Sequence, residues 1–171
     1  MEQGPDTVLV RYGEIGTKSS KVRSDMERLL RANLEAMLAD RAIGATVDHE
    51  WSRLLLRTTT AEVSSATTAA CETFGVVSAS PARTCAPTRE EICEALLAAA
   101  EDHPEGATFG VRASRAGAAD AHPFSSRDLE VEGGSAVEEQ TGATVDLDDP
   151  DRTYFVECRE DEAFVFTEKR S

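Results

Sequence analysis

Two arginines and a run of small polar and aromatic residues stand close together in the second half of this chain. Arg112 and Arg115 end a strand-like run, and the sequence His-Pro-Phe-Ser-Ser follows at 122–126. A guanidinium can pair with a phosphate through two parallel hydrogen bonds. Ser125 or Ser126 can cap the helix expected next, and the free N–H groups of a helix start favour an anion. The alternative is a plain helix cap beside two solvent-exposed arginines.

A second basic segment, RYGEIGTKSSKVR, occupies residues 11–23. It places a glycine turn after a strand-like run and gathers basic side chains, including Lys18, Lys21 and Arg23, ahead of a long helix-like pattern. Such a segment could contact an anionic partner. Taken alone, it is better explained as a helix start with exposed charge.

The usual parts of an enzyme are absent from the sequence. There is no phosphate-binding P-loop pattern, no G-x-G-x-x-G that opens a helix after a strand, and no G-x-S-x-G nucleophile pattern. The histidines are scattered and the cysteine spacing matches no zinc or redox pair; these residues are His49, His103, His122, Cys71, Cys85, Cys93 and Cys158. We therefore predict reduced cysteines and no catalytic residue, metal site or cofactor.

The net charge of −14 is unevenly distributed. Residues 1–60 carry nine acidic and nine basic side chains, whereas residues 128–168 carry 14 acidic side chains against two arginines. Only three of the 18 basic residues are lysines. Excess carboxylate with little lysine predicts a protein adapted to molar salt. At such salt the overall charge does not exclude RNA, so we expect localised arginines to bind it and the acidic stretch to face away from it.

The predicted elements of the first half follow the order strand, helix, strand, strand, helix, strand. A β-branched, apolar run predicts a strand at 7–12, and apolar residues at helical spacing predict a helix at about 21–40. Strands at 45–51 and 53–59, a helix at 61–73 and a strand at 75–81 follow. This order is typical of the ferredoxin-like α+β arrangement, with helices on one face of an antiparallel sheet.

A proline-containing stretch at 80–88 predicts a linker or the entry to a second domain, so we place the first domain at 1–80 and the second at 81–171. The second domain is predicted to contain helices at 88–102 and 126–141, a strand at 108–114 and a closing hairpin at 152–169, with Thr88 and Glu91 in a capping-box pattern. No apolar run is long enough to span a membrane, and the N-terminus lacks the pattern of a signal peptide. We therefore expect a cytoplasmic protein.

Three motifs in order resemble one family. VRYGEIGTKS at 10–19 is similar to the first strand and turn of the bacterial and archaeal tRNA 4-thiouridine synthetases, or tRNA sulfurtransferases. The second half of the chain is similar to the THUMP domain of that family in three stretches, TFGVRASRAG, HPFSSRDLE and the following Gly-Gly. The segment VECREDEAFVFTEK at 156–169 is similar to the closing hairpin of that domain. The resemblance covers nearly the whole chain and implies two small α+β domains, a ferredoxin-like domain followed by a THUMP domain. Together with the excess of carboxylates and the scarcity of lysine, the resemblance implies a member of this family from a haloarchaeon.

The resemblance also implies which residues bind RNA. A surface that holds the tRNA acceptor end would be formed by Arg112, Arg115, His122, Phe124, Ser125 and Ser126. Lys18, Lys21 and Arg23 would form a second, weaker contact patch on the first domain. An aromatic ring can stack on an unpaired base, but packing is the role that we favour for Phe124.

In this family an ATP-pyrophosphatase domain follows, with an S-G-G-x-D-S phosphate loop and catalytic cysteines. The chain stops at Ser171, and none of its cysteines matches those catalytic positions. The implied function is a tRNA-binding module for tRNA thiolation, which presents the acceptor end to a downstream or separately encoded catalytic domain. A link to the thiamine sulfur pathway and a homodimer are left open.

Two other functions stay open on the sequence alone. A THUMP protein can serve as an adaptor for another tRNA-modifying enzyme, such as an acetyltransferase or a methyltransferase. Tandem ferredoxin-like folds also form small-molecule-binding regulatory proteins, because a fold does not determine a function. The regulatory alternative predicts a ligand pocket at a sheet or dimer interface and no dependence on Arg112.

Overall fold

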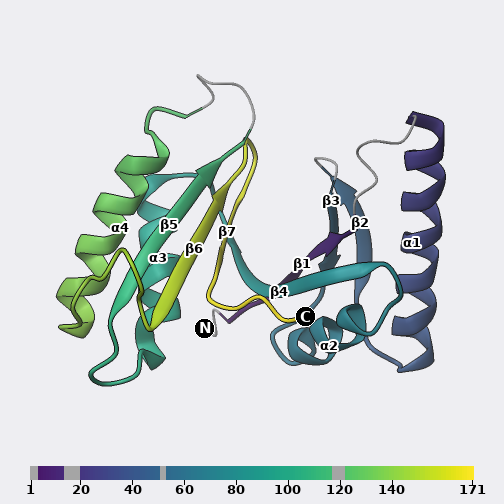
Figure 1. Cartoon of the computed structure of the whole chain (residues 1–171), viewed down its shortest axis with the longest axis horizontal. Coiled ribbons are helices and arrows are strands. Elements are labelled where there is room, and N and C mark those ends of the chain that lie inside the picture. Colours follow the sequence, from purple (N-terminus) through teal and green to yellow (C-terminus); the bar gives the residue numbers. More distant parts are fainter. Residues whose placement is uncertain (1–3, 14–19, 51–52, 117–121) are drawn as a thin grey trace. The chain divides into compact units, whose positions relative to one another are not determined.

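The computed structural model describes residues 4–13, 20–50, 53–116 and 122–171. The chain forms two compact units, one of Pro5–Pro81 with Glu168–Ser171 and the other mainly of Ala82–Thr167. Within the described ranges, no helix is long and apolar enough to cross a membrane. Figure 1 labels the helices and strands of both units.

The first unit has the predicted ferredoxin-like order of elements: β1 (Thr7–Tyr12), α1 (Ser20–Asp40), β2 (Thr46–Glu50), β3 (Arg53–Arg57), α2 (Val63–Cys71) and the first part of β4 (Val76–Cys85). Its strands lie in the order β2-β3-β1-β4. Both β1 and β2 pair antiparallel with β3. The prediction of a ferredoxin-like domain is therefore confirmed.

One face of this sheet packs against α1 and α2 to form the first core. Alternate residues of a strand point to the same face, and Val8 and Val10 of β1 accordingly join the core cluster. Helix α1 contributes Leu30, Leu34 and Leu38 from successive turns, all nearly inaccessible to solvent. The packed face of α1 thus lies on its C-terminal two thirds.

The second unit contains α3 (Arg89–Ala99), a short 3₁₀ turn η1 (Ala100–Asp102), β5 (Phe109–Arg115), α4 (Ser126–Thr141), β6 (Arg152–Cys158) and β7 (Ala163–Phe166). Its strands lie in the order β4-β7-β6-β5. Strand β5 pairs parallel with β6, and the closing hairpin β6–β7 is antiparallel, as predicted. Thr88 caps α3 by accepting a hydrogen bond from the Glu91 N–H at 3.2 Å. The Thr88 N–H donates to the Ala86 carbonyl at 2.9 Å, so only one half of the predicted capping box forms.

The predicted linker at 80–88 is largely strand, because β4 continues through Pro81 to Cys85. The fixed φ of proline suits an extended backbone, but proline has no N–H for a sheet hydrogen bond. After Pro81, residues Arg83–Cys85 pair antiparallel with β7. The proline therefore marks a change of pairing partner within one strand and does not end the strand.

Helices α3 and α4 approach each other closely at a glycine of α4. A Cβ atom on Gly133 would lie 2.6 Å from Cδ1 of Leu96 on α3 and 3.7 Å from Cγ1 of Val111 on β5. Leu96 is fully buried. A Cβ on the neighbouring Gly134 would meet nothing within 4 Å. The first glycine of the Gly-Gly pair therefore permits the close approach of the helices, and the second does not contribute to it.

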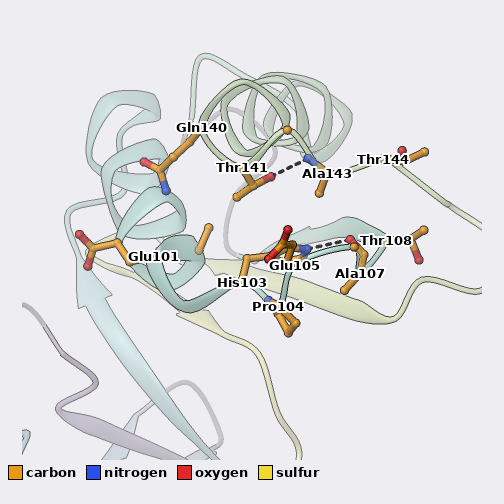
Figure 2. A pocket seen from close by; sticks show the side chains of 13 residues that line it. Glu101, His103, Pro104, Glu105, Ala107, Thr108, Gln140, Thr141, Ala143 and Thr144 are labelled. Carbon is orange, nitrogen blue, oxygen red and sulfur yellow. Dashed lines mark hydrogen bonds between the residues drawn. The ribbon is translucent and has the colours of Figure 1, made fainter.

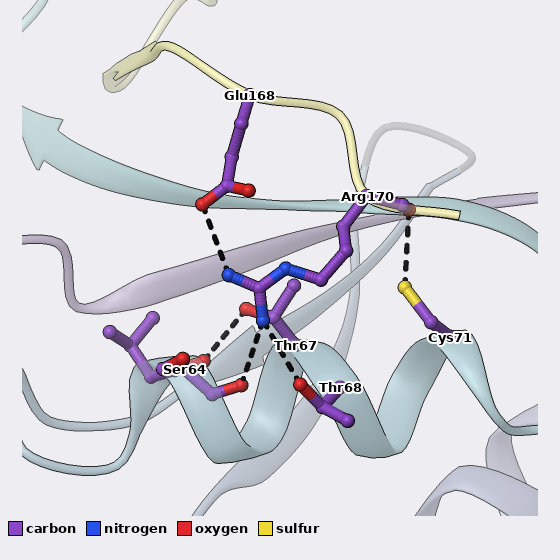
Figure 3. A network of polar contacts seen from close by, with 7 residues as sticks. Ser64, Thr67, Thr68, Cys71, Glu168 and Arg170 are labelled. Carbon is purple, nitrogen blue, oxygen red and sulfur yellow. Dashed lines mark hydrogen bonds and ion pairs between the residues drawn. The ribbon is translucent and has the colours of Figure 1, made fainter.

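The last residues of the chain belong to the first unit, where Arg170 holds them (Figure 3). Its backbone exchanges two hydrogen bonds of 2.8 Å with Ala79 of β4. Its guanidinium donates to the Ser64 carbonyl at 3.2 Å and to the Thr68 hydroxyl at 3.0 Å on α2, and pairs with Glu168 at 3.0 Å. This network ties the C-terminal residues to both the sheet and α2.

Candidate nucleic-acid interface

Strand β5 ends, and helix α4 begins, at one end of the second unit, which we call the β5–α4 corner and define by Arg115 and residues 122–128. The N–H of Ala116 donates to the Cys158 carbonyl at 2.8 Å, which ties the end of β5 to the end of β6. Arg159 follows Cys158 in the chain, and its carbonyl oxygen lies 2.7 Å from Nε2 of His122. The corner therefore gathers five of the six THUMP residues that the sequence selected.

Arg112 and Arg115 do not share one face of the sheet. Side chains alternate along β5, and Val111 and Ala113 face the helices in the second core. Arg112 is exposed on the opposite face, whereas Arg115, two residues after Ala113, lies on the side of α4. Because β5 is the edge strand of the sheet, a single ligand can contact both arginines only if it reaches around this edge or the end of the strand.

The surroundings of Arg112 are acidic. Its guanidinium donates a long hydrogen bond of 3.5 Å to the Leu147 carbonyl. Leu147 belongs to a turn in which the Asp146 carboxylate accepts hydrogen bonds from the N–H groups of Asp148 and Asp149 at 3.0 and 3.1 Å. A phosphate that binds Arg112 must therefore approach these carboxylates.

The start of α4 carries a complete capping box. The Ser125 hydroxyl accepts the Asp128 N–H at 3.1 Å, and the Asp128 carboxylate accepts the Ser125 N–H at 2.8 Å. The Ser125 N–H lowers the pKa of the Asp128 carboxyl, and the charges of Arg89 and Arg115 act in the same direction. The chain thus supplies its own anion to this helix start, so Ser125 positions the turn and Ser126 forms the first residue of the helix. The S-x-x-D pattern at 125–128 predicts this box, although Asp128 was not among the residues selected from the sequence.

Phe124 is part of the second core. It is only 5% exposed, and its ring stacks on His122 with centroids 5.4 Å apart. The guanidinium carbon of Arg89 lies 5.5 Å from the Phe124 ring centroid. Phe124 is therefore a packing residue, as the sequence analysis favoured over stacking on a base. No local pattern marks Arg89 as its partner, because the two residues are far apart in the chain.

His122 connects the turn before α4 to the end of β6. Its Nε2 lies 2.7 Å from the Arg159 carbonyl oxygen, which can only accept, so Nε2 carries the proton. The Cys158 sulfur lies 3.5 Å from the same nitrogen. Nδ1 is buried and has no hydrogen-bond partner within the part of the chain that the structure describes. His122 is therefore a buried residue that links the turn before α4 to the end of β6.

The expectation that the acidic stretch turns away from the corner is wrong. Arg89 pairs with Asp128 at 3.3 Å and with Glu132 at 3.1 Å. The Glu130 carboxylate accepts the N–H of Ala113 on β5 at 3.0 Å. The first turns of α4 thus place carboxylates among the arginines, because a helix presents successive residues to all sides. Arg127, which the sequence analysis did not select, is exposed on this same first turn.

The second predicted patch lies on the first unit, at the start of α1. Lys21 is exposed and pairs with Asp25 at 3.4 Å, and Arg23 is partly buried. Lys18 lies outside the described residues. An exposed ion pair of this kind contributes little to stability. Lys21 is therefore available to a partner at low cost.

A recess of about 770 Å³ lies at the other end of α4 (Figure 2). Glu101, Glu105 and the end of α4 line it, and none of the described lining residues is lysine or arginine. Both ring nitrogens of His103 are engaged, Nδ1 with the Tyr154 hydroxyl at 2.6 Å and Nε2 with the Ala107 carbonyl at 2.9 Å. Its negative surroundings disfavour phosphate, so we do not assign RNA to this recess.

The four thiols lack the environment of reactive cysteines. Burial raises the pKa of Cys85 to about 12 and raises the pKa of the other three thiols as well. A raised pKa lowers the fraction of thiolate, which is the nucleophile and the metal ligand. Among the described residues, no group of three or more His, Cys, Asp or Glu side chains could hold a metal ion.

Comparison with family models divides the chain into two matches. The model described as "ThiI ferredoxin-like domain" matches residues 7–80, and the model described as "THUMP domain" matches residues 86–168. Together these matches include nearly all the described elements of both units. They confirm the fold inferred from the sequence motifs.

Curated relatives carry the same two regions within longer chains. The chain is 51% identical to a "probable tRNA sulfurtransferase" of Halobacterium salinarum, over 98% of this chain and 42% of that protein. It is 39% identical to a protein of the same description from Methanosarcina acetivorans, over 98% of this chain and 41% of that one. The chain thus spans about two fifths of the length of these relatives. The similarity to a Halobacterium protein supports the predicted adaptation to high salt.

Solved structures share the fold. PH1313 from Pyrococcus horikoshii matches with a TM-score of 0.84 and 28% identity, over 97% of this chain and 55% of that one. A 4-thiouridine synthetase in complex with RNA and ATP matches with a TM-score of 0.82 and 24% identity, over 98% of this chain and 42% of that one. At this identity, the second match supports the fold alone.

Proposed function

Because the chain belongs to the family built from a ThiI ferredoxin-like domain followed by a THUMP domain, we propose that it is a tRNA-binding module of the tRNA sulfurtransferase type. It holds the acceptor end of tRNA and presents it to a catalytic domain or subunit outside this chain. We place the boundary of its two domains near residues 80 and 81. A tRNA partner implies a cytoplasmic location.

The observation that carries this proposal is the THUMP match over a unit whose corner joins arginines to a capped helix start. Arg115 and Arg127 lie on the side of α4 and suit phosphates of one strand, each through a charge-assisted pair. Arg112, on the opposite face of β5, suits a more distant phosphate or the 3′ end. The turn between them is held in place by two features. Ser125 forms the capping box, and the rings of His122 and Phe124 stack on each other.

The acidic surroundings are compatible with RNA only at high salt. In 1 M salt the Debye length is about 3 Å, so a carboxylate more than one contact away barely repels a phosphate. An arginine that touches a phosphate keeps its hydrogen bonds under the same conditions. We therefore expect binding to persist in molar potassium chloride and to weaken as the salt is removed, the reverse of the usual dependence on counterion release.

The test is a fluorescence anisotropy titration of tRNA with the full chain in molar potassium chloride. Hydrogen bonds to charged groups contribute roughly 1.5–3 kcal/mol each, so Arg115→Ala should weaken binding by about tenfold or more. The double variant Arg112→Ala/Arg115→Ala should weaken it further. Arg41→Ala removes an equal charge from the C-terminal end of α1 in the first unit and serves as the matched control.

Absence of tRNA binding at every salt concentration would refute the module. Equal affinity of the double variant and the wild type would refute the site. A duplex or single strand that binds as well as tRNA would point to an adaptor without preference for the acceptor end. Addition of a sulfurtransferase catalytic domain, followed by measurement of 4-thiouridine, separates this module from adaptors for other modifying enzymes.

A further inference from the structure

The last residues of the chain run along one edge of β4. In the second unit, Arg83–Cys85 of β4 pair antiparallel with β7. Nearer the start of β4, Ala79 forms an isolated antiparallel bridge with Arg170 through two hydrogen bonds of 2.8 Å. The segment after β7 therefore follows β4 back toward its first residue.

The same edge of β4 extends beyond this bridge to Val77. In an antiparallel strand every second residue bonds to the same neighbour, so the N–H and C=O of Val77 point to the side on which Ala79 meets Arg170. Among the described residues, no strand pairs with β4 at Val77 on that side. Val77 is 60% exposed. A chain that continued in this register would place the second residue after Arg170 opposite Val77.

Exposed apolar side chains stand beside this edge. Phe74, three residues before Val77, is 92% exposed and lines a groove of about 210 Å³ together with Met26 and Leu29 of α1. Gly75 has φ +99°, a conformation that glycine adopts readily, and the turn it makes carries Phe74. An open strand edge accepts an extended segment through main-chain hydrogen bonds, and apolar side chains beside the edge add contact area.

The contacts of Arg170 fix the position and the register of the chain at this point (Figure 3). Its guanidinium bonds to Ser64 and Thr68 of α2, and its carbonyl accepts the Cys71 thiol at 3.1 Å as well as the N–H of Ala79. The ends of a chain are commonly poorly ordered unless such contacts tie them down. The residue that follows Arg170 is therefore directed along the edge toward Val77.

The longer relatives indicate what continues along this edge. The match to the Halobacterium protein covers 98% of this chain and 42% of that protein, so more than half of the relative lies outside the match. The proposed function places the catalytic domain in that remaining part, and in the family resemblance this domain follows the THUMP domain. A segment must then join the residues around Arg170 to the catalytic domain, and it begins beside β4.

We propose that the edge of β4 at Val77, with Phe74 beside it, receives the segment that joins this chain to the catalytic domain. The segment adds to β4 as a short strand, pairs with the N–H and C=O of Val77, and covers Phe74 with an apolar side chain. This inference rests on the proposed function, which supplies the catalytic domain. It anchors that domain to the first unit, whereas the second unit holds the RNA.

Hydrogen–deuterium exchange in molar potassium chloride tests the pairing. It compares the present chain with the same chain joined at Ser171 to the part of the Halobacterium relative that follows its matched region, and we call the second protein the joined protein. In peptides that contain Val77, the Val77 amide should exchange at least about tenfold more slowly in the joined protein, because a paired amide exchanges only when the pairing opens.

Two variants of Val77 in the joined protein separate main-chain pairing from side-chain contact. Val77→Pro lacks the N–H to which the joining segment would bond, whereas Val77→Thr keeps this N–H and a β-branched side chain. A protease should cut the joining segment at least about tenfold faster in Val77→Pro than in the wild type, and at the wild-type rate in Val77→Thr. Phe74→Ser should also speed cleavage, since it removes the apolar contact.

Arg170→Ala tests the same pairing without a change on the edge. It removes the contacts to Ser64 and Thr68, so the joining segment should again be cut faster. Arg57→Ala is the matched control, because its side chain is 28% exposed against 29% for Arg170 and it also loses an ion pair in the first unit, with Asp48 at 3.2 Å. Thermal unfolding by circular dichroism checks that each variant is folded.

Equal exchange at Val77 in the two proteins would overturn the proposal, and so would equal cleavage of Val77→Pro and Val77→Thr. Protection of Val77 that grows with protein concentration would assign the edge to another molecule and overturn its assignment to the joining segment. None of these measurements uses tRNA. Failure of the edge and failure of the RNA-binding module are therefore distinguishable.

Discussion

The Gly-Gly pair of α4 yields a paired test of the second unit. Alanine is favoured over glycine inside a helix by about 0.8–1 kcal/mol, so Gly134→Ala, whose new methyl group meets nothing within 4 Å, should stabilise the protein by about that amount. At Gly133 the same gain is opposed, because the methyl group would lie 2.6 Å from Cδ1 of the buried Leu96. Overpacking of a core costs about 1–3 kcal/mol. We expect Gly133→Ala to destabilise the protein by up to about 2 kcal/mol.

Urea unfolding in molar potassium chloride, followed by far-UV circular dichroism, measures both variants against the wild type. The free energies of unfolding of the two variants should differ by about 1–3 kcal/mol, in favour of Gly134→Ala. The double variant Gly133→Ala/Leu96→Ala should show a non-additive rescue, since the shortened side chain no longer meets the new methyl group. Equal stabilisation by Gly133→Ala and Gly134→Ala would refute the assignment of Gly133 to the helix contact.

Further predictions concern the helix start and the thiols. Ser125→Ala should lower the free energy of unfolding by about 1 kcal/mol, whereas Ser126→Ala should change it by no more than about 0.5 kcal/mol in chemical denaturation. The folded-state pKa of Asp128 is lowered, so its stabilisation is present above the pKa of the unfolded chain, about 3.9, and is lost as the pH falls through the lower folded value. Asp128→Asn should therefore flatten the loss of stability at acid pH in a pH series of unfolding curves; an unchanged slope would contradict the cap assignment. Cys85, whose pKa is raised to about 12, should react with a thiol reagent at pH 8 far more slowly than a peptide cysteine, and at the peptide rate after unfolding.

Pairing within the protein limits the repulsion that the carboxylates of the corner exert on an approaching anion. Carboxylates that are paired within the protein, such as Asp128 with Arg89, contribute less repulsion than their number suggests. Each such pair, however, also holds an arginine that could otherwise face RNA.

Local sequence patterns were sufficient to predict the order and type of nearly every element. The ranges 7–12 and 126–141 agree with β1 and α4, because alternation and helical spacing are set by neighbouring residues. Residues 80–88 were predicted to be a linker or the entry to a second domain. The two units do divide after Pro81, but the segment is largely strand, because Arg83–Cys85 pair with β7 after the proline. The ferredoxin-like and THUMP domains were recognised from three ordered motifs, which the family models confirm.

The sequence by itself therefore determined the elements, their order and the identity of the domains, because these depend on contacts within a few residues and on motifs. Alternation along a strand already places residues 112 and 115 on opposite faces; only the tertiary structure shows that the helices cover the face of Val111 and Ala113 and leave Arg112 exposed on the other. Tertiary contacts alone also brought Arg89 onto Phe124 and Asp128, which follow it by more than thirty positions, and set carboxylates among the arginines of the corner. Long-range pairing of this kind leaves no mark on local spacing, so it becomes visible only when the chain is folded.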